Sequence, residues 1–293
     1  MKNFKGTFTA LVTPFKSDKV DYASLDRLLK QQLDGGVDGF VINGTTGESP
    51  TLTSEEKTEI FKHVRAFCGD KIPLIMGTGS NNTAKTIEDS KKAEALGADA
   101  LLVVVPYYNK PPQRGLYEHF KAVATAVKTP VMLYNVPGRT ITSLATETIR
   151  DLAKVPGIMG IKEATGKADF AAEIIKACGN EFVVLSGDDG SYVEFLGVGG
   201  HGVISVASHV IPQQMVQWKK WVQDNQIEKA RADIKKYLPL IDLLFVEANP
   251  IPVKKALALM GILDSASLRL PLVELAPEHT EKLKEEMKKV GVL

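Results

Sequence analysis

Short apolar segments alternate along the chain with segments in which apolar residues recur at helical spacing. Apolar runs of this length, bounded by turn residues, are typical of strands that are buried on both faces. Eight such runs occur, and we expect a strand in each of them. They are Thr7–Val12, Gly39–Asn43, Pro73–Gly77, Ala100–Val105, Pro130–Asn135, Ile158–Ala164, Phe182–Gly187 and Gly202–Val206.

The segments between these runs predict amphipathic helices. One of them follows Thr53-Ser54-Glu55-Glu56, which has the pattern of a capping box. In that helix Ile60, Val64 and Phe67 share one face, as the core-facing residues of a surface helix do. The predicted helices are Ser24–Leu33, Lys57–Phe67, Thr83–Leu96, Leu116–Val127, Leu144–Ala153, Phe170–Cys178 and Tyr192–Gly197.

Eight alternations of strand and helix predict an α/β fold, a (β/α)8 TIM barrel. A doubly wound sheet would need about five or six strands and a glycine-rich first turn, whereas the first turn here is Thr13-Pro14-Phe15. We expect a catalytic barrel over residues 1–225 and a C-terminal helical appendage over 226–293. After the eighth strand only helical patterns follow, at Pro212–Val222, Ile227–Phe245, Val253–Met260 and Pro277–Val290.

The composition is that of an ordinary globular protein. Of 293 residues, 44% are hydrophobic and 24% are charged, and the net charge of +1 leaves no basic surplus for nucleic acid. No apolar run approaches the ~20 residues that cross a bilayer, and the N-terminus has no signal-peptide core. Cys68 and Cys178 lie far apart and form no metal or redox motif. We expect a cytoplasmic protein without a nucleic-acid or membrane partner.

Lys162 falls inside the predicted strand 158–164. Because side chains alternate along a strand, we expect it to share a face with Ile158, Gly160 and Ala164, and Gly160 leaves room beside it. Burying an ammonium group is costly, so a buried lysine tends to lose its proton or to find a partner. A neutral lysine is a nucleophile suited to Schiff-base chemistry. The alternative is a lysine at a strand end that extends to solvent.

Polar residues gather where the predicted strands end. In a (β/α)8 barrel the active site lies at the carboxyl ends of the strands, so Lys162 lies where the fold places chemistry. The polar and aromatic groups at these ends are Thr13, Asn43–Ser49, Gly77–Ser80, Pro106–Asn109, Tyr134–Thr140, Lys162-Glu163, Gly187–Asp189 and Ser205.

Some of these residues have a purely structural alternative. Tyr134 could be a core residue with a hydrogen-bonded hydroxyl, and Arg139 could form a surface ion pair. The position of Arg139 after Pro137-Gly138 at a strand end favours a carboxylate ligand, which a guanidinium holds with two parallel hydrogen bonds. Asp188 and Asp189 have no histidine or third carboxylate nearby in the sequence, so we expect no metal site.

Five segments of the chain, in order, resemble the dihydrodipicolinate synthases, the first committed enzymes of bacterial lysine synthesis. The resemblance extends from about Phe8 to Pro271. The superfamily also includes N-acetylneuraminate lyase and several 2-keto-acid aldolases. The matching segments are Gly44-Thr45-Thr46-Gly47-Glu48-Ser49, Tyr107-Tyr108-Asn109-Lys110-Pro111, Tyr134-Asn135-Val136-Pro137-Gly138-Arg139-Thr140, Ile161-Lys162-Glu163-Ala164 and Asn249-Pro250-Ile251-Pro252-Val253-Lys254.

The resemblance implies a lyase that forms a Schiff base between Lys162 and pyruvate. The derived enamine would attack L-aspartate 4-semialdehyde, and cyclisation would yield 4-hydroxy-tetrahydrodipicolinate. No external cofactor is required, because the protonated imine is the electron sink. Proton transfer would pass through Tyr134, Thr45 and Tyr108. The residues that the resemblance places at the substrates are Thr46 and Arg139, which would bind the pyruvate and acceptor carboxylates, together with Gly187 and Ile204.

Two other functions fit the sequence less well. A related pyruvate-dependent lyase acting on a sugar acid is disfavoured by Arg139 and by Thr45-Thr46, since the sialic acid lyases lack the arginine and usually read Gly-Ser-Thr-Gly-Glu. A barrel that only binds a ligand would not need Lys162, Tyr134 and the other proton-transfer residues together.

The resemblance also implies partners and a mode of regulation. In this family Tyr108 enters the site of a neighbouring subunit, which implies a dimer, commonly paired into a homotetramer. Members that lysine inhibits bind it with histidines and a glutamate, whereas this chain has Ser54, Lys57 and Lys85 at the matching positions and retains Asn81 and Tyr107. Since like charges repel, we predict weak or absent lysine feedback.

Overall fold

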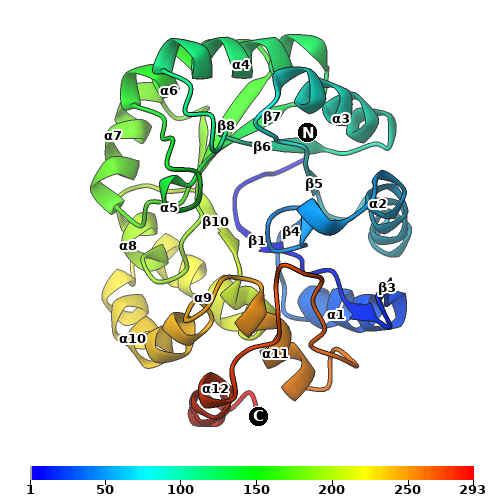
Figure 1. Ribbon diagram of the computed structural model, residues 1–293. Coiled ribbons are helices and arrows are strands. Elements are labelled where there is room, and N and C mark those ends of the chain that lie inside the picture. Colours follow the sequence, from blue (N-terminus) through cyan, green and yellow to red (C-terminus); the bar gives the residue numbers. More distant parts are fainter. Residues whose placement is uncertain (1) are drawn as a thin grey trace.

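A computed structural model, which describes residues 2–293, shows a closed barrel of parallel strands inside a ring of helices (Figure 1). The strands pair in the order β1-β10-β9-β8-β7-β6-β5-β4, and β4 pairs with β1 to close the barrel. All eight predicted strands are confirmed, each one or two residues shorter than expected. They are β1 (Thr7–Ala10), β4 (Gly39–Ile42), β5 (Leu74–Gly77), β6 (Ala100–Val104), β7 (Val131–Asn135), β8 (Ile158–Glu163), β9 (Val183–Ser186) and β10 (Gly202–Ser205).

The helices of the ring match the predicted amphipathic segments. The capping box forms as expected, because Thr53 accepts from the backbone N–H of Glu56 and the Glu56 carboxylate accepts from that of Thr53. Phe67 was wrongly expected to face the core: its side chain is exposed and Cys68 is buried in its place. The helices are α1 (Tyr22–Asp34), α2 (Ser54–Cys68), α3 (Thr83–Ala95), α4 (Gln113–Ala126), α6 (Thr146–Leu152), α7 (Ala168–Cys178) and α8 (Tyr192–Gly197).

Several short elements have no counterpart in the sequence prediction. They are too short for apolar periodicity to reveal them. They are the hairpin β2 (Phe15–Lys16) and β3 (Lys19–Val20), the 3-10 turns η1 (Ser49–Thr51) and η2 (Ala207–His209), and the one-turn helix α5 (Pro137–Thr140).

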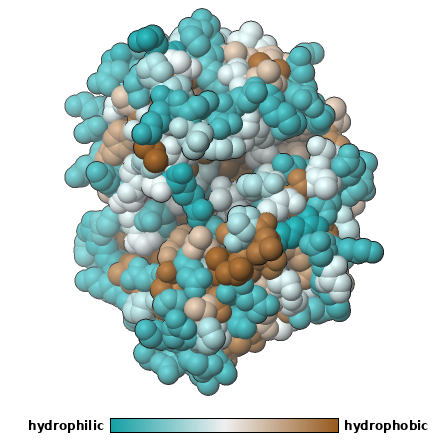
Figure 2. All heavy atoms as spheres, in the orientation of Figure 1, coloured by the Kyte–Doolittle hydropathy of each residue, from teal (hydrophilic) through white to brown (hydrophobic). Residues whose placement is uncertain are grey.

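Four helices follow the last strand. The second packs against α8, against the first and against the last, and the last pair lies at the lower edge of the molecule in Figure 1. Figure 2 shows exposed apolar atoms in the lower half of this face, and Leu270 and Val273, which follow the third helix, are exposed. No helix among residues 2–293 is long and apolar enough to cross a membrane. The four are α9 (Pro212–Gln223), α10 (Ile227–Leu243), α11 (Ile251–Leu259) and α12 (Pro277–Lys289).

The apolar core has two layers, one inside the barrel and one between the strands and the helices. Strand alternation creates them: in β1, Phe8 and Ala10 belong to the inner layer, while Thr7 and Thr9 face the helices. The inner layer consists of Phe8, Ala10, Val41, Ile75, Ala100, Leu102, Met132, Tyr134, Val136, Val183, Leu185 and Ile204.

Strand β8 departs from regular alternation at its start. Its pairing with β7 shifts register, so that Ile158 pairs with Val131 but Gly160 pairs with Met132. Such an irregularity inserts one residue and reverses the alternation before it. Ile158 therefore packs in the outer layer, and the prediction that it shares a face with Lys162 is wrong.

Candidate active site at the carboxyl ends of the strands

Lys162 lies inside the barrel, near the carboxyl end of β8. Its neighbour Ile161 packs in the outer layer, so alternation turns Lys162 inward, where only 7% of it is exposed. Tyr134 is its partner in register on β7, and the Lys162 Nζ lies 4.2 Å from the centre of the Tyr134 ring. Within residues 2–293 no carboxylate pairs with this amino group and no acceptor bonds to it. The side chain is buried without the partner that a structural lysine needs.

Space for the lysine side chain comes from Gly187, which follows β9. A Cβ at this position would lie 2.8 Å from the Lys162 Cε and 2.6 Å from the Ala164 Cβ. Gly160, which was expected to provide this room, instead lies against Val183, whose carbonyl oxygen would be 2.2 Å from an added Cβ. The role expected of Gly160 was wrong because its closest neighbour is the adjacent strand. At Gly187, by contrast, an added Cβ would overlap Ala164 and Lys162, so this position excludes any larger residue.

The turn after β4 presents unpaired amides. Its own hydrogen bonds run from the N–H of Gly47 to the carbonyl of Gly44 and from that of Glu48 to Thr45. The N–H groups of Thr45 and Thr46 donate to no acceptor within residues 2–293. Thr46 is buried whereas Thr45 is exposed. Successive unpaired amides in a turn form a concavity that suits an anion, here a carboxylate.

A buried ion pair lies beneath this turn, between Glu48 and Lys254 of α11. The Lys254 Nζ donates to the Glu48 Oε1 at 2.7 Å and to the Thr13 carbonyl at 2.9 Å, and both charged side chains are fully buried. Burial lowers the pKa of Lys254, and the Glu48 carboxylate opposes that change. The pair links the turn to the C-terminal helices. Neither partner was given a role from the sequence, because the pair joins positions far apart in the chain.

Arg139, on α5, is exposed at the same end of the barrel. Its Nη2 donates to the main-chain carbonyl of Asn249 at 3.2 Å, and no carboxylate within residues 2–293 pairs with it. The expected alternative, a surface ion pair, does not form in this part of the chain. A guanidinium held on one side and unpaired on the other can bind the carboxylate of a ligand.

The three hydroxyls expected to transfer protons are not hydrogen-bonded to one another within residues 2–293. Tyr134 is buried in the inner layer, next to Lys162. Tyr108 is 88% exposed and has a positive φ of 73°, a backbone conformation that non-glycine residues rarely adopt. No hydrogen bond links Tyr134, Thr45 and Tyr108 within residues 2–293. Ile204, on β10, is buried in the inner layer below them.

Other polar residues at the strand ends face away from the barrel interior. The Glu163 carboxylate accepts from the Asn135 side chain at 2.7 Å and from the Thr165 N–H at 2.6 Å. Burial raises the pKa of Glu163. Ser205 accepts from the N–H of Ser208 at 2.8 Å. These two residues therefore shape the loops and do not line the interior.

Asp188 and Asp189 also accept hydrogen bonds from groups in nearby loops. Asp188 accepts from both the N–H and the hydroxyl of Ser191, at 2.9 and 2.6 Å. One oxygen of the buried Asp189 accepts from the N–H groups of Val206 and Ala207, both at 2.9 Å, and burial raises the pKa of Asp189. Each carboxylate thus organises a loop after β9 or β10.

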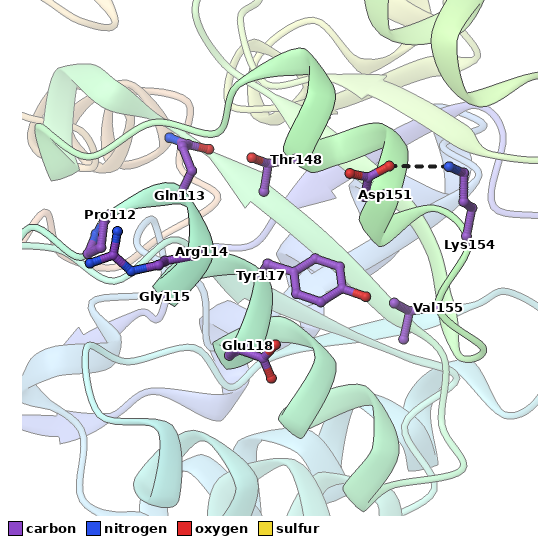
Figure 3. Close-up of a pocket in the computed structure, with 10 residues that line it drawn as sticks. All are labelled: Pro112, Gln113, Arg114, Gly115, Tyr117, Glu118, Thr148, Asp151, Lys154 and Val155. Atoms are coloured by element: carbon purple, nitrogen blue, oxygen red, sulfur yellow. Dashed lines mark hydrogen bonds and ion pairs between the residues drawn. The ribbon is translucent and has the colours of Figure 1, made fainter.

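One surface groove lies away from this chemistry. Figure 3 shows it between α4 and α6, where an ion pair joins Asp151 and Lys154. None of the eight expected site residues lines it. Burial and chemistry, and not this groove, therefore identify the candidate active site.

The site combines an inward, unpaired lysine beside a tyrosine with two groups suited to carboxylates. In a TIM barrel this combination is typical of lyases that bind a carbonyl substrate through a lysine. The model of the dihydrodipicolinate synthetase family matches residues 3–290. The chain belongs to that family.

Individual members of the family are similar to this chain over its whole length. The chain is 80% identical over 293 residues to the 4-hydroxy-tetrahydrodipicolinate synthase of Bdellovibrio bacteriovorus, covering all of both chains. It is 46% identical to that of Kosmotoga olearia over 99% of each chain. A crystal structure of dihydrodipicolinate synthase from Thermotoga maritima has a TM-score of 0.97, 42% identity and 99% coverage of both chains. The family and the enzyme activity predicted from the sequence are confirmed.

Proposed function

We propose that the chain condenses pyruvate with L-aspartate 4-semialdehyde through an imine on Lys162, giving 4-hydroxy-tetrahydrodipicolinate for lysine and diaminopimelate synthesis. The observation that carries the proposal is the inward Lys162, buried beside Tyr134 without a carboxylate partner. An amine in that setting is suited to attack a carbonyl carbon, because no ion pair has to be broken first.

The reaction proceeds in four steps. The Lys162 amine attacks the ketone carbon of pyruvate, and loss of water forms the imine. A methyl proton then leaves and the electron pair forms an enamine. The enamine carbon attacks the aldehyde carbon of the semialdehyde and forms the new carbon–carbon bond. Finally the substrate amine attacks the imine carbon, which closes the ring and releases Lys162. Gly187 supports these steps by leaving room for the lysine side chain.

The two substrate carboxylates have separate binding groups. The pyruvate carboxylate would accept from the amides of Thr45 and Thr46 and from the Thr46 hydroxyl, since these amides have no acceptor within residues 2–293. The acceptor carboxylate would bind Arg139. Ile204 would form the apolar floor below pyruvate. Such fixed donors hold the reacting carbons in attack geometry.

Proton transfer would pass from Tyr134 through Thr45 to Tyr108 of a neighbouring subunit. The 88% exposure of Tyr108 supports this arrangement, because an exposed tyrosine in one chain is available to enter another. The chain would then act as a dimer at least, and the expected homotetramer would be two such dimers. Light scattering measures that assembly.

Mixing two inactive variants tests the shared site. In a hybrid of Lys162→Ala with Tyr108→Phe, one site contains an intact Lys162 from one chain and an intact Tyr108 from the other. Random mixing makes about half of all dimers hybrid with one good site in each, so we expect about a quarter of wild-type activity to return. No recovery would mean that Tyr108 serves the site of its own chain.

Acceptor specificity is tested with a panel of aldehydes. Pyruvate consumption is measured with L-aspartate 4-semialdehyde, N-acetylmannosamine or glyceraldehyde as the second substrate. We expect turnover with the semialdehyde alone, and its loss in Lys162→Ala. Turnover with a sugar aldehyde instead would keep the imine chemistry but contradict the role given to Arg139.

A further inference from the structure

Asn249 contacts both groups that are proposed to bind substrate carboxylates. It precedes α11, and its side-chain Nδ2 donates to the Thr46 Oγ1 at 2.8 Å. Its main-chain carbonyl accepts from Arg139 at 3.2 Å. Asn249 is 6% exposed, and its amide oxygen accepts from none of residues 2–293. The bond to Thr46 is thus the only hydrogen bond of this side chain within the described residues.

The bond fixes the direction of the Thr46 hydroxyl. A threonine hydroxyl has one proton to donate and two lone pairs to accept with. Because the Asn249 amide donates to it, one lone pair is occupied and the proton is left to point elsewhere. The Thr46 hydroxyl donates to no acceptor within residues 2–293. It is therefore oriented as a donor, which is the role that a carboxylate ligand requires.

We propose that Asn249 is a positioning residue that orients the pyruvate and acceptor sites from one point in the C-terminal segment. Its side chain sets the Thr46 hydroxyl as a donor to the pyruvate carboxylate, and its carbonyl holds Arg139 for the acceptor carboxylate. Because the two contacts use different parts of Asn249, a side-chain substitution separates them. The inference rests on the proposed function.

The test measures kcat/KM separately for the two substrates in Asn249→Ala. Loss of the amide frees the Thr46 hydroxyl to rotate, so we expect kcat/KM for pyruvate to fall about tenfold. The carbonyl that holds Arg139 remains, so kcat/KM for the semialdehyde stays within about twofold. A residue that only anchors the C-terminal helices would move both values together, and equal losses would overturn the proposal.

A double-mutant cycle with Thr46→Val asks whether Asn249 acts through Thr46. Once the hydroxyl is absent, Asn249→Ala should change pyruvate kcat/KM by less than about twofold. Full additivity would contradict the proposal. Arg27→Gln is the matched control: Arg27 bonds the Ile262 carbonyl and pairs with Asp264, so it also ties the barrel to the C-terminal segment but lies outside the site. It should leave both values unchanged.

Two further measurements keep the outcome unambiguous. Asn249→Asp preserves the shape but accepts from the Thr46 hydroxyl and adds a negative charge, so its pyruvate kcat/KM should fall at least as far as that of Asn249→Ala; a wild-type value would overturn the proposal.

The pyruvate concentration that half-saturates borohydride trapping reports imine formation without the acceptor. If wild type gives no adduct, the proposed function fails; if it does and Asn249→Ala needs no more pyruvate, only the inference fails.

Discussion

Two buried lysines at the same end of the barrel differ in what their amino groups contact. Lys254 donates to a buried carboxylate, Glu48, and to the Thr13 carbonyl. Lys162 has neither kind of partner within residues 2–293 and lies against the face of Tyr134. Both are among the least exposed side chains of their type in the chain. Burial by itself therefore does not identify a chemical role.

The partner distinguishes a structural lysine from a reactive one. A buried ammonium with a carboxylate and a carbonyl is satisfied, and removing it alone leaves the carboxylate buried without a partner. Burying an amine without them costs free energy that no hydrogen bond offsets, which is typical of a group kept for its chemistry. The two lysines should consequently respond in opposite ways to the same substitution.

Lys162→Met should separate activity from stability most strongly. Loss of the nucleophile is expected to lower kcat on the order of 10⁴-fold or more. Methionine has a similar volume and no ion pair is lost, so the free energy of unfolding should change by less than about 1.5 kcal/mol. Turnover and urea unfolding of one preparation measure both. Residual activity within tenfold of wild type would contradict the assignment.

Lys254→Met should show the reverse. Removing one member of a buried pair leaves Glu48 uncompensated, which costs about 3–5 kcal/mol of unfolding free energy. Folded protein should still form the imine, because Lys162 is untouched. In the double variant with Glu48→Gln, the loss should be smaller than the sum of the two single losses. Strict additivity would mean that the pair does not act as a unit.

His209 extends the comparison to a buried group that stays neutral. Its Nε2 accepts from the Val12 N–H, and burial lowers its pKa from 6.5 to about 4. The folded pKa is lower than the unfolded pKa of 6.5, so the neutral His209 contributes its full stability to the fold above pH 6.5. As the pH falls from 6.5 toward 4, the unfolded chain binds a proton at this histidine and the folded chain does not, so that contribution is lost. The loss amounts to about 3 kcal/mol. His209→Gln should have a shallower slope of stability against pH; an unchanged slope would contradict this account.

The smallest expected effect is that of added free lysine on the reaction rate, which depends on the partly exposed side chains of Lys57 and Lys85. Lys85 pairs with Glu88 and Asp89, whereas no carboxylate pairs with Lys57 within residues 2–293. Because Lys57 carries most of the expected repulsion, added lysine should leave the rate within about twofold of its starting value. A steady-state assay with increasing lysine measures this. Half-inhibition at micromolar lysine would refute it.

The sequence predicts the fold well because its apolar runs are regular. The eight strands and the flanking amphipathic helices each repeat a pattern that local chemistry imposes. The alternation fails at Ile158, because one inserted residue in β8 is invisible without its partner strand. The hairpin Phe15–Val20 and α5 are too short to carry any periodicity.

Lys162 and Arg139 are predicted from their positions at strand ends and the other site residues from a resemblance, but the sequence does not predict the residues that they and their neighbours contact. Nothing near Glu48 in the sequence points to Lys254, and nothing near Thr46 points to Asn249, since each pair forms only when the C-terminal helices return to the barrel. The expectation that Gly160 leaves room for Lys162 failed for the same reason: contacts across strands depend on register, which a single sequence does not contain.

Borohydride reduction in the presence of pyruvate tests the central claim most directly. Trapping converts an imine into a stable secondary amine, and peptide mapping then locates it. We expect one reduced pyruvate per chain on the peptide that contains Lys162, and none on the peptide that contains Lys254. An adduct absent from Lys162, or found on Lys254, would contradict the distinction between the two buried lysines.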